Sequence, residues 1–204
     1  MGRKSRHLRL KKRTAIYCEG ETELRYFEML KEKYRGFNVN SILIKNENSS
    51  HMKLLQRAIA SNKSLESIGK KNTRFVIEST YVVFDGDNIE YAELLRCRKF
   101  AKRNGIKIIF SNINFEIWIL MHFEPVSKSY TKQELYTKLS KKKYFNTDYE
   151  RFKGNDLSPY LANKVNVAMA NADRLSINQN RESLPNPFTN VNEFLPEIFT
   201  TDKF

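Results

Sequence analysis

Three carboxylates stand where they could bind a metal ion together. Glu19 directly follows the apolar run Thr14–Cys18, and Asp85 and Asp87 directly follow the apolar run Tyr81–Phe84. Short apolar runs bounded by turn residues are typical of buried strands. If both strands belong to one parallel sheet, their carboxyl ends lie on the same edge, where ligands bind. Clustered carboxylates repel one another, and a hard cation such as Mg²⁺ or Mn²⁺ neutralises them while leaving positions for water and phosphate.

This set of acids predicts phosphoryl-transfer chemistry, with Glu19 helping to move a proton. Each motif also has a simpler interpretation. Asp85-Gly86-Asp87-Asn88 is strong turn chemistry, and Glu19-Gly20-Glu21 is compatible with a solvated loop. The occurrence of both motifs at the carboxyl ends of predicted strands favours a site over two unrelated turns.

Strands and helices alternate in the first part of the chain. Further strands are expected at residues 39–45 and 106–110, and helices are expected from about Thr22, from about Ser50, and at 89–104 and 114–123. Gly105 is expected to end the third of these helices, and the polar stretch 61–74 is expected to be a surface loop. This alternation predicts an α/β fold with a parallel, Rossmann-like sheet flanked by helices.

The remainder predicts a helical C-terminal extension. Helices are expected at 131–139, where Thr131 and Glu134 form a capping-box pattern, and at 159–175. Apolar residues of the tail are expected to dock onto the domain: Phe194, Ile198 and Phe199. Aromatic rings among lysines suit a partner or a substrate strand, unless they pack the extension: Tyr136, Tyr144, Phe145 and Tyr149. The predicted divisions are a basic arm (1–13), an α/β domain (14–125) and the extension (126–204).

The composition favours a polyanionic partner. Lys and Arg number 36 against 23 Asp and Glu, a net charge of +13, and such an excess is attracted to phosphates. The arm Arg3–Arg13 is expected to bind phosphates without sequence preference, or else to be a solvated tail. Two cysteines provide no disulfide framework, no apolar run approaches the ~18 residues that span a bilayer, and no signal-peptide pattern is present. We therefore expect a cytoplasmic protein without a membrane partner.

The motifs resemble those of a known family. Ile16-Tyr17-Cys18-Glu19-Gly20-Glu21-Thr22-Glu23 resembles the first motif of Toprim (topoisomerase–primase) domains, and Val82-Val83-Phe84-Asp85-Gly86-Asp87 resembles their second. The segments 111–123, which contains Phe115-Glu116-Ile117-Trp118, and 186–191, Asn-Pro-Phe-Thr-Asn-Val, are similar to segments of RloB-like proteins. The resemblance covers residues 13–199, and these last two segments are its most specific part.

The resemblance implies a Mg²⁺-dependent (or Mn²⁺-dependent) Toprim nuclease, commonly paired with an ATPase subunit in phage-defence systems. It implies that Glu19 is an acid/base or metal carboxylate and that Asp85 and Asp87 are metal ligands. Glu116 would be a further acid of nucleases that use two metals, although a helix-start acid facing the dipole is equally consistent. Lys153 would steady phosphate charge, or be an ordinary surface lysine. Many Toprim domains have Asp at the position of Glu23, which receives no role here.

Several alternatives stay open. A Toprim ribonuclease that matures ribosomal RNA fits the size and charge, and so does a nucleic-acid-binding subunit without catalysis. A nucleotide-sugar glycosyltransferase also uses a strand-ending Asp-x-Asp, but it leaves Glu19 and the positive charge unexplained. DNA, RNA including tRNA, endo- or exonucleolytic cleavage and a homo-oligomer are all compatible with the sequence. Trp118 is expected to pack in the core, and His122 is expected at a helix end, either packed or partly exposed. Asn112 and Asn114 are candidate caps of the helix that carries Glu116.

Overall fold

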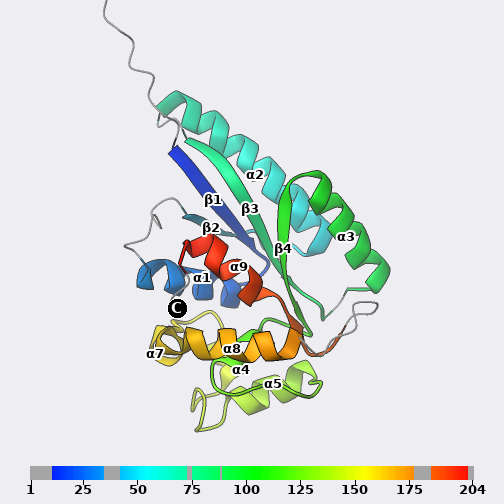
Figure 1. The fold of residues 1–204 in the computed structure, drawn as a ribbon, viewed down its shortest axis with the longest axis vertical. Coiled ribbons are helices and arrows are strands. Elements are labelled where there is room, and N and C mark those ends of the chain that lie inside the picture. Colours follow the sequence, from blue (N-terminus) through cyan, green and yellow to red (C-terminus); the bar gives the residue numbers. More distant parts are fainter. Residues whose placement is uncertain (1–10, 35–41, 73–74, 88, 177–184, 202–204) are drawn as a thin grey trace, which may run out of the picture.

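The chain forms a five-stranded sheet with helices on both faces (Figure 1). The computed structural model describes residues 11–34, 42–72, 75–87, 89–176 and 185–201. The strand order is β2-β1-β3-β4-β5, where β1 to β4 are parallel and β5 is antiparallel to β4. The strands span β1 Lys11–Cys18, β2 Ile42–Asn46, β3 Phe75–Asp85, β4 Ile106–Asn112 and β5 Phe188–Thr189. The predicted α/β, Rossmann-like class is therefore confirmed.

The helices divide between the faces of the sheet. α2 (His51–Asn72) and α3 (Tyr91–Arg103) lie on one side. The other side carries α1 Glu21–Lys33, α4 Glu116–Met121, α5 Lys132–Leu139, α6 Tyr149–Phe152, α7 Ser158–Leu161, η2 Ala162–Lys164, α8 Val165–Ser176 and α9 Val191–Phe199. Within the described residues, no helix is both long and apolar enough to cross a membrane.

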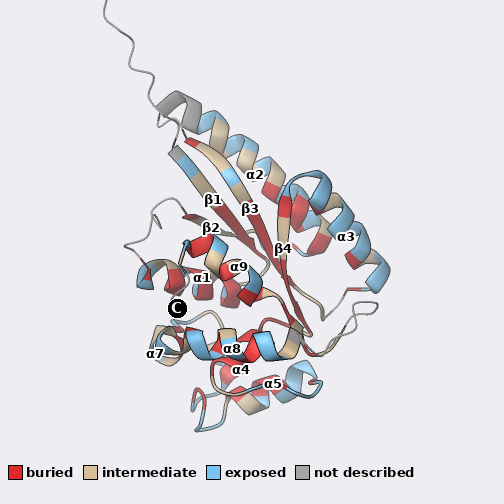
Figure 2. Cartoon of the chain, in the orientation of Figure 1, coloured by how far each residue is buried: buried red, intermediate tan, exposed pale blue. Residues whose placement is uncertain are grey.

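Alternation along the strands creates a core on each face. In β1, Ala15 and Tyr17 face α2 and α3, whereas Ile16 and Cys18 face the opposite helices. Successive side chains of a strand point to opposite faces, so a strand covered on both sides becomes a continuous apolar run. Figure 2 shows the result, with buried residues filling the central strands and the inner sides of the helices. Cys18 and Trp118 are buried, as predicted, and of the two interpretations of His122 the packed one is confirmed.

The C-terminal helices share the larger core with α1 and α4. Phe199 and Ile198 are buried there, which confirms that the tail docks onto the domain. Of the two interpretations of the rings among the lysines, packing of the extension is confirmed, because Tyr136, Tyr144, Phe145 and Tyr149 are all buried. The rings of Tyr136 and Phe145 both pack on Tyr149, with the Phe145 centroid 4.9 Å from that of Tyr149, and such clusters stabilise beyond the area that they bury.

The predicted loop at 61–74 is also wrong, because α2 continues to Asn72. Its polar residues face the sheet and bond to it: Tyr17 donates a hydrogen bond to Asn62 at 2.6 Å, and Asn62 donates to Thr80 at 2.8 Å. Lys45 likewise donates to Ser61 at 2.8 Å. Half-buried polar groups that are satisfied in this way interrupt the apolar period from which a helix is predicted.

Strand limits and caps differ in part from prediction. β1 begins at Lys11, so residues 11–13 of the predicted arm belong to the sheet, and residues 1–10 lie outside the described residues. Thr131 and Glu134 form the predicted capping box, and Gly105 ends α3 with a φ of 65°. Neither candidate cap of α4, Asn112 or Asn114, is used, because Phe115 precedes that helix without a side-chain cap.

Candidate metal-binding active site

Strand pairing brings Glu19 beside Asp85. Cys18 of β1 is in register with Val83 of β3, and the backbone N–H of Glu19 donates to the carbonyl oxygen of Val83 at 3.0 Å. Glu19 and Asp85 therefore leave adjacent strands at the same edge of the sheet. This is the arrangement that places ligands at the carboxyl ends of parallel strands.

Gly86 fixes the turn that follows β3. Its N–H donates to the carbonyl oxygens of Ser111 at 2.9 Å and Ile113 at 3.0 Å, which ties the turn to the end of β4. A Cβ atom at this position would lie 2.6 Å from Oδ1 of Asn112, closer than any real contact. Only glycine therefore allows the backbone between Asp85 and Asp87 to approach β4 so closely.

Helices on one face add two more acids. Glu116 opens α4 and is 1% exposed, and Glu23 lies in the first turn of α1 and is 4% exposed. The Oε2 atom of Glu19 and the Oδ1 atom of Asp85 are sealed from solvent and have no hydrogen-bond partner in the described part of the chain. Unpartnered buried carboxylate oxygens are rare in proteins and call for a ligand or a proton.

The electrostatics show that these acids form one cluster. Burial, followed by the charges of Glu23, Glu116, Glu19 and Asp87, raises the pKa of Asp85 well above its ordinary value. Burial, with Glu116 adding to it, raises the pKa of Glu23 to about 7. Burial also raises the pKa of Glu19. Carboxylates perturbed by both burial and like charge are typical of functional sites.

Two lysines from the C-terminal part offset some of this charge. Nζ of Lys153 lies 2.9 Å from Oε1 of Glu116 and donates to the hydroxyl of Tyr136 at 2.7 Å. Burial lowers the pKa of Lys153, but Glu116 and Tyr136 together outweigh burial and raise that pKa above its ordinary value. Nζ of Lys132 lies 2.8 Å from Oδ2 of Asp87. Lys153 is thus placed among the acids rather than on open surface.

Sequence reasoning missed Glu23 and Lys132. Glu23 follows Glu19 by one helical turn, but an acid in a first turn is equally expected from the helix dipole. Lys132 is the first residue of α5, and nothing in its sequence context ties it to Asp87. Only the structure shows that both residues belong to the site, through the effect of Glu23 on Asp85 and the ion pair of Lys132 with Asp87.

The donor set fits a hard divalent cation. Every candidate ligand is a carboxylate, and the sealed oxygens of Glu19 and Asp85 supply unpartnered acceptors. Among the described residues, no three acidic, histidine or cysteine side chains already converge on one point. An ion held by Glu19, Asp85 and Asp87 would therefore require rotation of these side chains and the release of Lys132 from Asp87.

The comparisons with known proteins place the chain in a family. The model of the family described as RloB-like protein matches residues 14–198. The chain belongs to the RloB-like family. No curated protein and no solved structure matches it. The two segments on which the RloB-like resemblance is most specific lie side by side, because residues 188–189 form β5 and pair with Ser111 and Asn112 at the end of β4.

Raised carboxyl pKa values predict that metal-free protein loses stability as the pH rises. The folded pKa of Glu23 is about 7 against an ordinary value of 4.5, so between these values the folded protein holds a proton that the unfolded chain has released. Stability is therefore lost through this window. Glu23→Gln should gain on the order of 3 kcal/mol over wild type between pH 4.5 and pH 7.

Chemical denaturation in the presence of a chelator, at pH 5 and at pH 7.5, measures this difference. Glu150→Gln, at an exposed position of α6, is the matched control and should follow wild type. Identical pH dependence in wild type and Glu23→Gln would show that Glu23 does not hold its proton in the folded state.

Proposed function

We propose that this RloB-like chain is a divalent-metal-dependent nuclease of the Toprim type, which hydrolyses phosphodiester bonds of nucleic acid and serves an antiviral defence system with an ATPase partner. The observation that carries the proposal is the cluster of buried, mutually repelling carboxylates at the carboxyl edge of a parallel sheet. Such a cluster has no role in stability, because like charges without solvent oppose folding.

Each residue has a part in this chemistry. Glu19, Asp85, Asp87 and Glu116 would hold Mg²⁺ or Mn²⁺, which, when bound, polarises a phosphoryl oxygen and lowers the pKa of water. Glu19 would take up or return a proton, since its raised pKa brings it closer to neutral pH. Lys153, held between Glu116 and Tyr136, would balance negative charge that develops on the phosphate.

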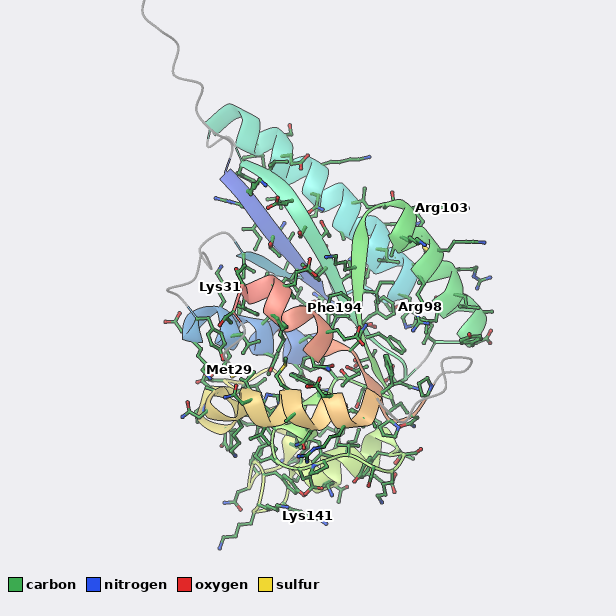
Figure 3. All side chains as sticks on the ribbon, in the orientation of Figure 1. Met29, Lys31, Arg98, Arg103, Lys141 and Phe194 are labelled. Carbon is green, nitrogen blue, oxygen red and sulfur yellow. The ribbon has the colours of Figure 1, made fainter. Side chains whose placement is uncertain are left out.

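A basic groove on α5 supports nucleic acid as the substrate. It has a volume of 350 Å³ and is lined by Lys128, Tyr130, Gln133, Glu134, Thr137, Lys138 and Lys141. Nζ of Lys128 lies 4.9 Å from the centre of the Tyr130 ring, and Nζ of Lys138 lies 5.6 Å from it. The same helix carries Lys132, which contacts Asp87. Lysines around an aromatic ring suit a sugar–phosphate strand, and Lys141 extends away from the body of the molecule (Figure 3).

Asp85→Asn tests the catalytic assignment. The variant should lose metal-dependent cleavage by at least about 100-fold, because one central ligand and its charge are removed, while nucleic-acid binding is retained. Cleavage of labelled single- and double-stranded DNA and RNA, with Mg²⁺, Mn²⁺ or chelator, measures this, and Glu150→Gln is the control. Wild-type protein that binds nucleic acid but cleaves none of these substrates, even with its ATPase partner, would support the non-catalytic binding subunit instead.

The double variant Lys128→Ala/Lys141→Ala tests the groove. Each phosphate contact contributes about one unit to the slope of log affinity against log salt, so the slope should fall by up to about 2 units. The matched control is Lys99→Ala/Arg103→Ala on the exposed face of α3, which removes the same charge elsewhere (Figure 3 labels Arg103). Equal losses in both variants would mean that net charge alone attracts nucleic acid.

Control by the ATPase partner predicts low activity from the isolated chain. An unregulated nuclease would damage its own cell, so toxicity on expression should appear only when the ATPase is co-expressed, and Glu19→Gln should abolish it. The comparison uses three strains: the chain alone, with its partner, and with its partner plus Glu19→Gln. Full toxicity of the chain alone that Glu19→Gln does not relieve would contradict both the control and the catalytic assignment.

A further inference from the structure

His51 stands next to the acid cluster on the face of the sheet opposite Lys153. Asn46 of β2 pairs with Cys18 of β1, and the N–H of Glu47 donates to the carbonyl oxygen of Cys18 at 3.2 Å. The chain therefore passes the end of β1, where Glu19 begins, directly before α2 starts at His51. His51 has a φ of 46°, a left-handed conformation that is uncommon outside glycine and is concentrated at functional sites.

The imidazole of His51 is held by the two elements that flank the Asp85–Asp87 turn. Its ring packs edge-on against Phe84, the last apolar residue of β3, with centroids 5.6 Å apart. Its Nδ1 atom lies 3.3 Å from Oε1 of Glu93 in the first turn of α3. A carboxylate at Nδ1 fixes the orientation of a histidine ring. The residue is 8% exposed, so its position is defined by packing.

The other ring nitrogen, Nε2, makes no hydrogen bond to a residue that the structure describes. We therefore take Nε2 as the atom that is available to a substrate. The charge of His51 acts on Glu19, where it opposes the rise in pKa that burial causes. Glu19 and Asp85, at the edge of the sheet, thus have Glu23, Glu116 and Lys153 on one face of the sheet. On the other face lie His51 and Glu93.

We propose that His51 is a further substrate-contacting residue, whose Nε2–H donates to a non-bridging oxygen of the scissile phosphodiester while Nδ1–H donates to Glu93. This inference rests on the proposed nuclease function and adds a residue to it. The Glu93 carboxylate at Nδ1 orients the ring, and a hydrogen bond from Nε2–H to an anionic phosphate oxygen is charge-assisted. A positive charge on His51, on the face opposite Lys153, would hold the phosphate between these two residues. The phosphate would then be oriented for attack by water.

Activity and binding variants test the contact. His51→Ala should reduce metal-dependent kcat/KM by about 10- to 100-fold, since one charge-assisted hydrogen bond is lost. His51→Gln, whose amide N–H occupies nearly the place of Nε2–H, should recover part of that loss. Glu93→Gln should fall between wild type and His51→Ala, and Glu90→Gln, an exposed acid just before α3, should match wild type. Full activity of a folded His51→Ala variant would overturn the inference.

A second readout does not depend on cleavage. ¹⁵N resonances of the histidines are recorded in full-length protein with chelator, while a ten-nucleotide single-stranded DNA or RNA is added. Both His51 nitrogens should take the shifts of the protonated ring on binding, and less so in Glu93→Gln. A His51 signal that stays unchanged while the oligonucleotide binds would overturn the contact, even if the wild type proves to be a nuclease. A shifted signal in a protein that never cleaves would refute the nuclease proposal alone.

Discussion

Repulsion among buried carboxylates is the constraint on which the rest of this structure depends. Glu19, Glu23, Asp85 and Glu116 lie near one another with little solvent, and each raises the free energy of ionising its neighbours. An isolated turn or helix end would relieve such repulsion by moving away. Here the acids are fixed by strand register, by the bond from Glu19 to Val83, and by a Gly86 turn that fits tightly on β4. The apolar cores on both faces of the sheet stabilise an arrangement that its own charges oppose.

The C-terminal helices take part in the site as well as in the core. Lys153 directly follows α6 and reaches Glu116 because α6 packs against α5, where the rings of Tyr149 and Tyr136 lie 5.9 Å apart. The Tyr136 hydroxyl, on the same cluster, accepts a hydrogen bond from Lys153. An aromatic cluster is rigid because its rings have few rotatable bonds. It therefore places the lysine more precisely than a flexible surface helix would, which explains why these rings are buried rather than displayed.

The sequence predicts the position of a residue only where a pattern in the neighbouring residues indicates its secondary structure or its burial. Apolar runs mark β1, β3 and β4, so the acids that follow Cys18 and Phe84 are found without a structure. Half-buried polar residues show no such pattern in the sequence. Asn62 and Ser61 are typical of loops by residue type, and only their hydrogen bonds show that they face the sheet. Glu23 resembles any acid in a first helical turn. Rings among lysines indicate surface or core equally well, and only the packing of α5 and α6 decides between them.

The two segments on which the resemblance to RloB-like proteins is most specific, 111–123 and 186–191, meet at the end of β4 and fix its position. β5 pairs with Ser111 and Asn112, and the Ser111 and Thr189 hydroxyls lie 3.0 Å apart. Beyond β5, the side-chain amide of Asn190 makes the two hydrogen bonds that the backbone of a neighbouring strand would make. Its Oδ1 accepts from the N–H of Phe110 at 2.7 Å, and its Nδ2 donates to the carbonyl oxygen of Ile108 at 3.1 Å. These bonds satisfy the outer edge of β4, which would otherwise expose unpaired backbone groups. Because Gly86 rests on the carbonyl oxygens of Ser111 and Ile113, fixing the end of β4 also fixes the turn between Asp85 and Asp87. A tail far along the chain thereby determines where the central carboxylates of the site can stand.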